Sequence, residues 1–148
     1  MGKLVNAVGA MSGTSLDGID VALIATDGEG VVARRAFASV PYDAAFRDRL
    51  RAAIVAARDL DDRLARPGIL ADVERDLTDR HGDAIRGFLK DTGLDAGDVD
   101  LVAFHGQTVL HAPERRLTVQ IGDGPRLARA LGLRVVYDLR AADAAAGG

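Results

Sequence analysis

The sequence contains no cysteine and no tryptophan, and aromatic residues make up only 4% of its 148 positions. The missing cysteine excludes disulfide frameworks, thiolate zinc sites and cysteine nucleophiles, and it is typical of a cytoplasmic protein. No apolar run approaches the roughly 20 residues that a membrane-spanning helix needs, and the N-terminus lacks the layout of a signal peptide. We therefore expect a cytoplasmic protein that has no membrane partner.

An excess of charge of one sign is also missing, because 19 basic residues stand against 22 acidic ones and the net charge is −3. A chain with this balance and few aromatic rings offers neither a cationic surface nor stacking platforms for bases. Nucleic acid is therefore not an expected partner. A hydrophobic share of 48% over 148 residues is typical of one ordinary globular domain.

The first forty residues alternate short apolar runs with turn signals, which predicts a three-stranded antiparallel meander. Asp17-Gly18 and Asp27-Gly28 supply residues that tolerate the backbone angles of tight hairpin turns. Apolar residues then recur every three or four positions over 43–58, and again after Pro67, which predicts two helices.

The second half of the chain alternates strand and helix patterns, which indicates parallel strand pairings. We therefore predict an α/β fold in which a mixed sheet combines the antiparallel meander with parallel strands and carries flanking helices. The predicted elements are a buried strand over 99–104 that ends at His105-Gly106, a strand over 117–122, a short helix over 125–131 and a strand over 134–139. The final residues show no helix or strand pattern, so the chain looks interrupted there.

The strongest local motif is the run Gly9–Gly18, which is rich in glycine and hydroxyl side chains. Glycines let backbone N–H groups approach an anion closely, and Ser12, Thr14 and Ser15 add hydroxyl donors, so the loop is a candidate phosphate cradle. It lacks the lysine of a P-loop. A hairpin turn that merely contains polar residues explains the same pattern, and the two interpretations are compatible.

Polar side chains follow the predicted strand over 99–104, in the order His105-Gly106-Gln107-Thr108. Such positions present ligand-binding groups in open sheets, and a histidine with a glutamine offers both donors and acceptors to a sugar hydroxyl or an amide. A satisfied structural histidine is the alternative. A metal site built from His105, His111 and Asp123 matches no metal signature, so no protein metal site is predicted.

Two aspartates lie near the last predicted strand, Asp138 at its end and Asp143 in the Ala/Gly-rich segment after it. A carboxylate at such a place can take a proton from a hydroxyl or water, or hold Mg²⁺ through its waters. Asp143 is equally suited to cap a helix. Spacing alone leaves these alternatives open.

Taken together, four blocks in the same order resemble the anhydro-N-acetylmuramic acid kinase family. They are Met11–Asp20, His105–Val109, Gln120–Asp123 and Asp138–Gly148. The resemblance implies a ribonuclease-H-like lobe of the sugar kinase, heat-shock protein 70 and actin superfamily. It also implies that residues 1–148 form the N-terminal lobe of a two-lobed kinase whose C-terminal lobe lies outside this chain.

The activity implied by the resemblance joins hydrolysis to phosphoryl transfer in cell-wall recycling. With ATP and Mg²⁺, such a kinase opens the anhydro ring of 1,6-anhydro-N-acetylmuramic acid and phosphorylates O6, giving N-acetylmuramic acid 6-phosphate. An isolated lobe is expected to be inactive, and to self-associate, for example as a homodimer, or to be marginally stable because its interlobe surface is exposed.

The resemblance also implies roles for individual residues. Asp143 matches the expected general base, for which Asp138 is the competitor. The ATP-phosphate loop corresponds to Gly13, Thr14, Ser15, Leu16, Asp17, Gly18, Ile19 and Asp20. The expected substrate contacts are His105, Gln107, Asp138 and Arg140.

The chain departs from the family pattern where Ala141 and Ala142 replace further arginines, so a second cationic clamp is not expected there. Two other hypotheses remain. One is a non-catalytic sugar-binding or interaction module derived from such a lobe. The other is a different kinase or acyl-phosphate enzyme of the same superfamily, which would share the phosphate loop without the His105–Thr108 block.

Overall fold

The computed structural model describes residues 2–148 and is built around one six-stranded mixed sheet. The strands are β1 (Val5–Ser12), β2 (Gly18–Thr26), β3 (Val32–Pro41), β4 (Leu101–Ala112), β5 (Leu117–Ile121) and β6 (Val135–Tyr137). They follow the order β3-β2-β1-β4-β5, and β6 pairs with β4. The predicted α/β fold with a mixed sheet is therefore confirmed.

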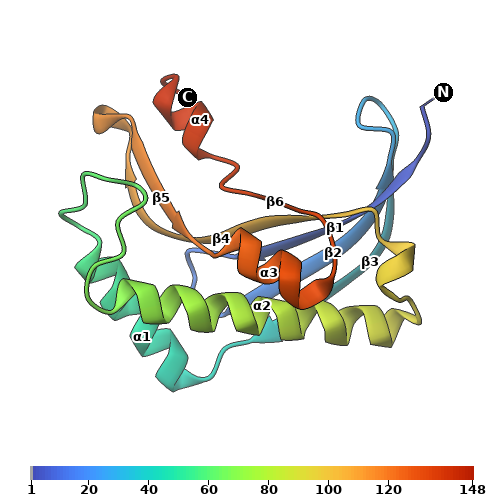
Figure 1. Cartoon of the computed structure of the whole chain (residues 1–148), viewed down its shortest axis with the longest axis horizontal. Coiled ribbons are helices and arrows are strands. Elements are labelled where there is room, and N and C mark those ends of the chain that lie inside the picture. The colour runs from blue at the N-terminus through green and yellow to red at the C-terminus, as the bar shows by residue number, and fades with distance from the viewer. Residues whose placement is uncertain (1) are drawn as a thin grey trace.

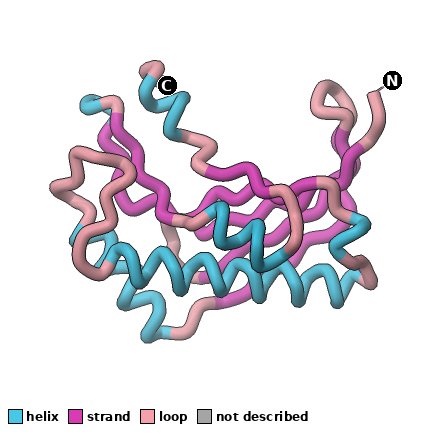
Figure 2. Tube along the Cα trace, viewed as in Figure 1, coloured by secondary structure: helices cyan, strands magenta, loops and turns pink. Residues whose placement is uncertain are grey.

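Helices cover one face of this sheet, as Figures 1 and 2 show. The helices are α1 (Ala44–Ala56), α2 (Leu70–Thr92), α3 (Gly124–Leu131) and α4 (Ala141–Ala145), with 3₁₀ turns η1 (Ala96–Asp98) and η2 (Pro113–Arg115). The first three lie along the covered face, and the short α4 lies on the opposite side, near the C-terminus (Figure 1). No helix in the described part of the chain is long and apolar enough to cross a membrane.

The predicted meander is confirmed, because β1 pairs antiparallel with β2 and β2 pairs antiparallel with β3. Strand β2 shows why it forms: Ile19, Val21, Leu23 and Ala25 alternate along it and all point into the core. Strand β3 lies at the edge of the sheet and is mostly exposed.

The two long predicted helices are also present. Asp43 caps α1 by accepting a hydrogen bond from the Phe46 N–H at 2.8 Å, and α2 ends where Gly93 adopts a left-handed conformation. Residues at helical spacing along α2 are buried, including Leu77 and Ile85. The predicted short helix corresponds to α3, which Asp123 caps.

Strand β4 differs from the prediction that it ends at His105-Gly106, because it continues to Ala112. Its first part pairs parallel with β1 and β6, and its second part pairs antiparallel with β5 from Gln107 onward. Gly106 has φ +71, and a Cβ there would lie 2.2 Å from the Ile121 carbonyl oxygen. A glycine with polar neighbours is the sequence pattern typical of a strand end. Here the glycine instead allows one continuous strand to change its pairing partners.

The expectation of an irregular C-terminal segment is also wrong. Residues 141–145 form α4, because alanine has the highest intrinsic helix propensity and four of these five residues are alanine. Asp143 lies inside the first turn of this helix, and its cap position is occupied by Arg140. The helix returns over β5 and buries Ala144.

Candidate functional site

The loop between β1 and β2 contains most of the predicted phosphate-binding block. Thr14 and Ser15 are exposed at its tip, and the Ser15 hydroxyl donates to the Asp17 carboxylate at 2.8 Å. Leu16 has φ +58 and is nevertheless buried, while its N–H donates to the Gly13 carbonyl at 3.2 Å. The buried Leu16 side chain pins a tight turn whose polar groups face outward.

A chain of buried hydrogen bonds anchors the base of this loop. The Tyr42 hydroxyl donates to the Ser12 oxygen at 2.9 Å, and the Ser12 hydroxyl donates to Gln107 Oε1 at 2.5 Å. The Tyr42 N–H also donates to the Asp17 carbonyl at 2.8 Å. Burial raises the pKa of Tyr42 to about 12, so its hydroxyl stays a donor at neutral pH. Tyr42 therefore holds both ends of the loop.

Gly18 and Asp20 connect the loop to the edge strand β3. A Cβ at Gly18 would lie 2.4 Å from the Val40 carbonyl oxygen, so only glycine lets the two strands approach this closely. The Ser39 hydroxyl donates to the Asp20 carboxylate. Ile19, between them, is buried in the core. Gly18 and Ile19 thus stabilise the fold, and in this part of the predicted block only the exposed carboxylate of Asp20 is accessible to a ligand.

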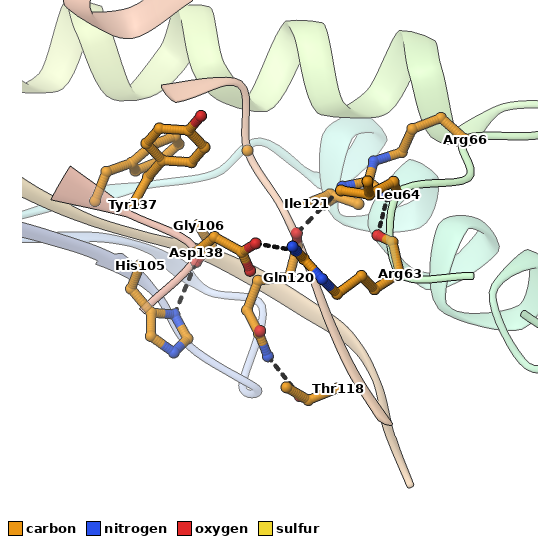
Figure 3. Close-up of a pocket in the computed structure, with 12 residues that line it drawn as sticks. Arg63, Leu64, Arg66, His105, Gly106, Thr118, Gln120, Ile121, Tyr137 and Asp138 are labelled. Carbon is orange, nitrogen blue, oxygen red and sulfur yellow. Dashed lines mark hydrogen bonds and ion pairs between the residues drawn. The ribbon is translucent and has the colours of Figure 1, made fainter. Parts of the chain in front are cut away.

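A second region is a cleft between the β4–β5 hairpin, the end of β6 and the loop before α2 (Figure 3). Its lining combines apolar walls with polar side chains that face one another. The polar lining residues are Arg63, Arg66, His105, Thr118, Gln120 and Asp138. An adjoining hollow of about 520 Å³ extends from Arg63 and Asp138 to Arg116 and α4.

Two ion pairs hold the loop before α2 in place beside this cleft. Arg63 pairs with Asp138, and Arg66 pairs with Glu74 at 2.9 Å. Glu74 also accepts the Gly122 N–H at 2.9 Å, which fixes the turn after β5. Sequence reasoning assigned no role to Arg63 or Arg66, since no local pattern marks a loop arginine whose partners lie elsewhere in the chain.

Asp138 and His105, both predicted substrate contacts, lie in the same cleft. Asp138 adopts φ +55 directly after β6, which turns its carboxylate toward Arg63. His105 is half-buried, and its Nδ1 lies 3.2 Å from the Gly106 carbonyl oxygen. The structure therefore brings these two predictions together from strands that are distant in sequence.

Gln107, Arg140 and Asp143 lie outside the cleft lining. Gln107 is completely buried, and its Nε2 donates to the Thr108 carbonyl at 3.1 Å, so both ends of its amide are occupied. Asp143 is exposed on α4 with its carboxylate beside Gly148, and Arg140 is exposed at the start of that helix. Neither residue is part of the lining of the cleft or the adjoining hollow.

A buried histidine lies beneath the strand that carries the cleft. His81 of α2 packs edge-on against Phe104 with 4.9 Å between ring centroids, and its Nδ1 lies 2.8 Å from the Leu77 carbonyl oxygen. Burial lowers the pKa of His81 to about 4, so the ring is neutral at pH 7 and can pack in an apolar core. Sequence reasoning had placed it on the buried stripe of this helix.

Comparison with known proteins now identifies the family. The family model described as anhydro-N-acetylmuramic acid kinase matches residues 5–148. The chain belongs to the anhydro-N-acetylmuramic acid kinase family. The resemblance to the anhydro-N-acetylmuramic acid kinases is thereby confirmed, and the matched residues of this chain include both the β1–β2 loop and the cleft.

Curated anhydro-N-acetylmuramic acid kinases match the whole chain. The protein from Rhizobium etli is 58% identical over 142 residues, which cover 96% of this chain and 38% of that protein. The one from Brucella canis is 55% identical over 148 residues, or 100% of this chain and 40% of that protein. The one from Bradyrhizobium diazoefficiens is 53% identical over 145 residues. The chain thus spans about 40% of the length of these relatives.

Proposed function

We propose that this chain is one lobe of an ATP-dependent kinase that opens the 1,6-anhydro ring of 1,6-anhydro-N-acetylmuramic acid and phosphorylates O6. The observation that carries the proposal is the juxtaposition, on one strand, of a loop suited to phosphate and a cleft suited to a sugar. The Ser12–Gln107 hydrogen bond joins the loop base to β4, and His105 of β4 lines the cleft. Family membership supplies the reaction.

The strand order supports a ribonuclease-H-like lobe of the sugar kinase, heat-shock protein 70 and actin superfamily. An antiparallel meander of three strands is followed by β4 parallel to β1, and then by β6 parallel to β4. The β4–β5 hairpin is an addition to that pattern, and it builds one wall of the cleft. We infer that the hairpin adapts the lobe to its sugar.

The β1–β2 loop fits the phosphates of ATP by its donor groups. Thr14 and Ser15 present exposed hydroxyls, and Gly13 leaves the backbone open to a close approach. ATP supplies the phosphoryl group, and Mg²⁺, which binds through phosphates and one or two carboxylates, would be held beside the exposed Asp17 or Asp20. No three His, Asp or Glu side chains converge on a metal position within residues 2–148.

Asp143 is the proposed general base that takes a proton from the attacking water. Its carboxylate is exposed and makes no ion pair within the described residues, whereas the Asp138 carboxylate is already bound by Arg63. We propose that Asp138 and His105 bind the sugar, that Arg140 binds an anionic group of it, and that Gln107 positions the strand rather than contacting the ligand.

The test is an ADP-release assay on the complete protein in which these residues occur. We expect ADP release only when the anhydro sugar is present, and a loss of at least about a hundredfold in kcat for Asp143→Asn. Asp83→Asn, which changes an exposed aspartate of α2 that lines neither the cleft nor the adjoining hollow, is the matched control and should leave the rate unchanged. Turnover that does not depend on sugar would contradict the proposal.

A further inference from the structure

Gln120, in the cleft wall formed by β5, has one polar atom that no group in the described part of the chain satisfies. The residue is 7% exposed, and its Oε1 is buried without a hydrogen-bond partner. Its Nε2 donates to the Thr118 hydroxyl oxygen at 2.8 Å and to the Thr108 hydroxyl oxygen at 3.1 Å. Buried polar atoms are nearly always paired in folded proteins, so an unpaired carbonyl oxygen in a cleft wall points to a ligand.

The orientation of this amide follows from its neighbours. The Thr118 hydroxyl donates its single proton to the Leu110 carbonyl at 3.3 Å, and its oxygen accepts from Gln120 Nε2 at 2.8 Å and lies 3.4 Å from His111 Nδ1. Nε2 is therefore the atom beside Thr118, and Oε1 is the atom left over. Figure 3 shows the Gln120 side chain between His105 and Arg63.

The remaining charges of the cleft are already matched inside the protein. Arg63 pairs with Asp138, and Arg66 pairs with Glu74. His105 Nδ1 lies 3.2 Å from the Gly106 carbonyl oxygen. The buried unpaired group of the cleft wall is thus the neutral acceptor Gln120 Oε1, and a ligand must bring a neutral donor to it.

We infer that Gln120 is a sugar-binding residue whose Oε1 accepts a hydrogen bond from a hydroxyl or amide N–H of the ligand. The inference rests on the proposed sugar kinase function. It adds that the cleft wall formed by β5 recognises neutral hydrogen-bond donors of the sugar. Phosphate and carboxylate groups offer acceptors, so they do not fit Oε1. Because Oε1 is sealed from solvent, the ligand displaces part of the lining, and the exposed Arg63–Asp138 pair is the weakest contact there.

The test uses the ¹⁵N-labelled complete protein in which these residues occur and 1,6-anhydro-N-acetylglucosamine, a neutral sugar that carries the donors without a carboxylate. We expect the Gln120 side-chain amide signals to shift on saturation. Gln120→Leu should weaken binding about fivefold to tenfold, which is the effect of one lost hydrogen bond. Thr92→Val is the control, because it removes a hydroxyl of α2 that lies outside the cleft lining, and it should change the affinity less than about twofold.

Three outcomes would overturn the inference: no sugar binding by the unmutated chain, unchanged affinity in Gln120→Leu, or inorganic phosphate shifting the same Gln120 signals. If Gln120→Leu does not fold, the Gln120 signals of the unmutated chain decide the question without a variant. Loss of binding in Gln120→Leu together with sugar-independent ADP release would leave this site standing and reject the kinase. Unchanged sugar binding in Gln120→Leu together with sugar-dependent ADP release would reject this site and leave the kinase function standing.

Discussion

The β1–β2 loop and the cleft beside the β4–β5 hairpin are held by different kinds of contact. The loop base rests on neutral hydrogen bonds among Tyr42, Ser12 and Gln107, all of them buried. The cleft is tied by ion pairs, and the Arg63 and Asp138 side chains are 43% and 29% exposed. Buried hydrogen bonds resist rearrangement, whereas exposed ion pairs contribute little and exchange easily with water. The loop is therefore preformed, and the cleft can adjust to a ligand.

Strand β4 connects the two regions through Gly106. Gln107, on one side of this glycine, is committed to the loop base, and His105, on the other side, lines the cleft. The pairing of β4 with β1 shifts register at this point. A substitution here tests whether the two regions depend on each other.

Gly106→Ala should have the largest effect, because it combines a left-handed backbone with a Cβ placed 2.2 Å from the Ile121 carbonyl oxygen. We expect the free energy of unfolding to fall by at least about 3 kcal/mol, measured by urea denaturation. Gly30→Ala is the control, since a Cβ there meets nothing within 4 Å, and it should change stability by less than about 0.5 kcal/mol. Equal effects of the two substitutions would show that β4 is not strained at Gly106.

Ser12→Ala should have an intermediate effect, because the Tyr42 hydroxyl and Gln107 Oε1 stay buried and each loses its hydrogen bond to the Ser12 hydroxyl. We expect a loss of about 2 kcal/mol in the free energy of unfolding. Ser15→Ala removes the same hydroxyl from the exposed tip of the loop and should cost less than about 0.5 kcal/mol. If Ser12→Ala were as mild as Ser15→Ala, the loop base would not be the preformed part of the site.

Arg63→Gln should have the smallest effect on stability, a loss below about 1 kcal/mol that shrinks further in 1 M salt, because its ion pair is exposed. Thermal unfolding at low and high salt measures both quantities. Arg51→Gln, which removes an exposed pair with Asp48 on α1, is the matched control. A stability loss well above that of Arg51→Gln would mean that the cleft is as rigid as the loop.

Local patterns in the sequence predicted most of the elements. Alternation in β2 and helical spacing in α2 each place their apolar residues on one face, and burial of that face decides the element. The extension of β4 past Gly106 was not predictable in this way, because β5 satisfies the backbone of residues 107–112 from the other arm of a hairpin. The short α4 was missed because its alanines carry no apolar–polar pattern.

In the candidate site, too, some residues were predictable from local sequence and others were not. Composition alone marked Gly9–Gly18 as a phosphate loop candidate, since glycine and hydroxyl residues act there through the local backbone. Arg63 and Gln120 could not be found from sequence, because each acts through partners on other segments of the chain. Family resemblance singled out the block that contains Gln120 without giving it a role.

The sequence by itself determined the identity of the strands and long helices, the turn chemistry of the β1–β2 loop and the family, because these depend on periodicity and on residues adjacent in the chain. Only the tertiary structure decided that Gln107 belongs to the loop base while His105 belongs to the cleft. It also decided that Gln120 keeps an unpaired acceptor there. These outcomes depend on which distant segments satisfy each hydrogen bond, and that choice is made by packing the whole chain.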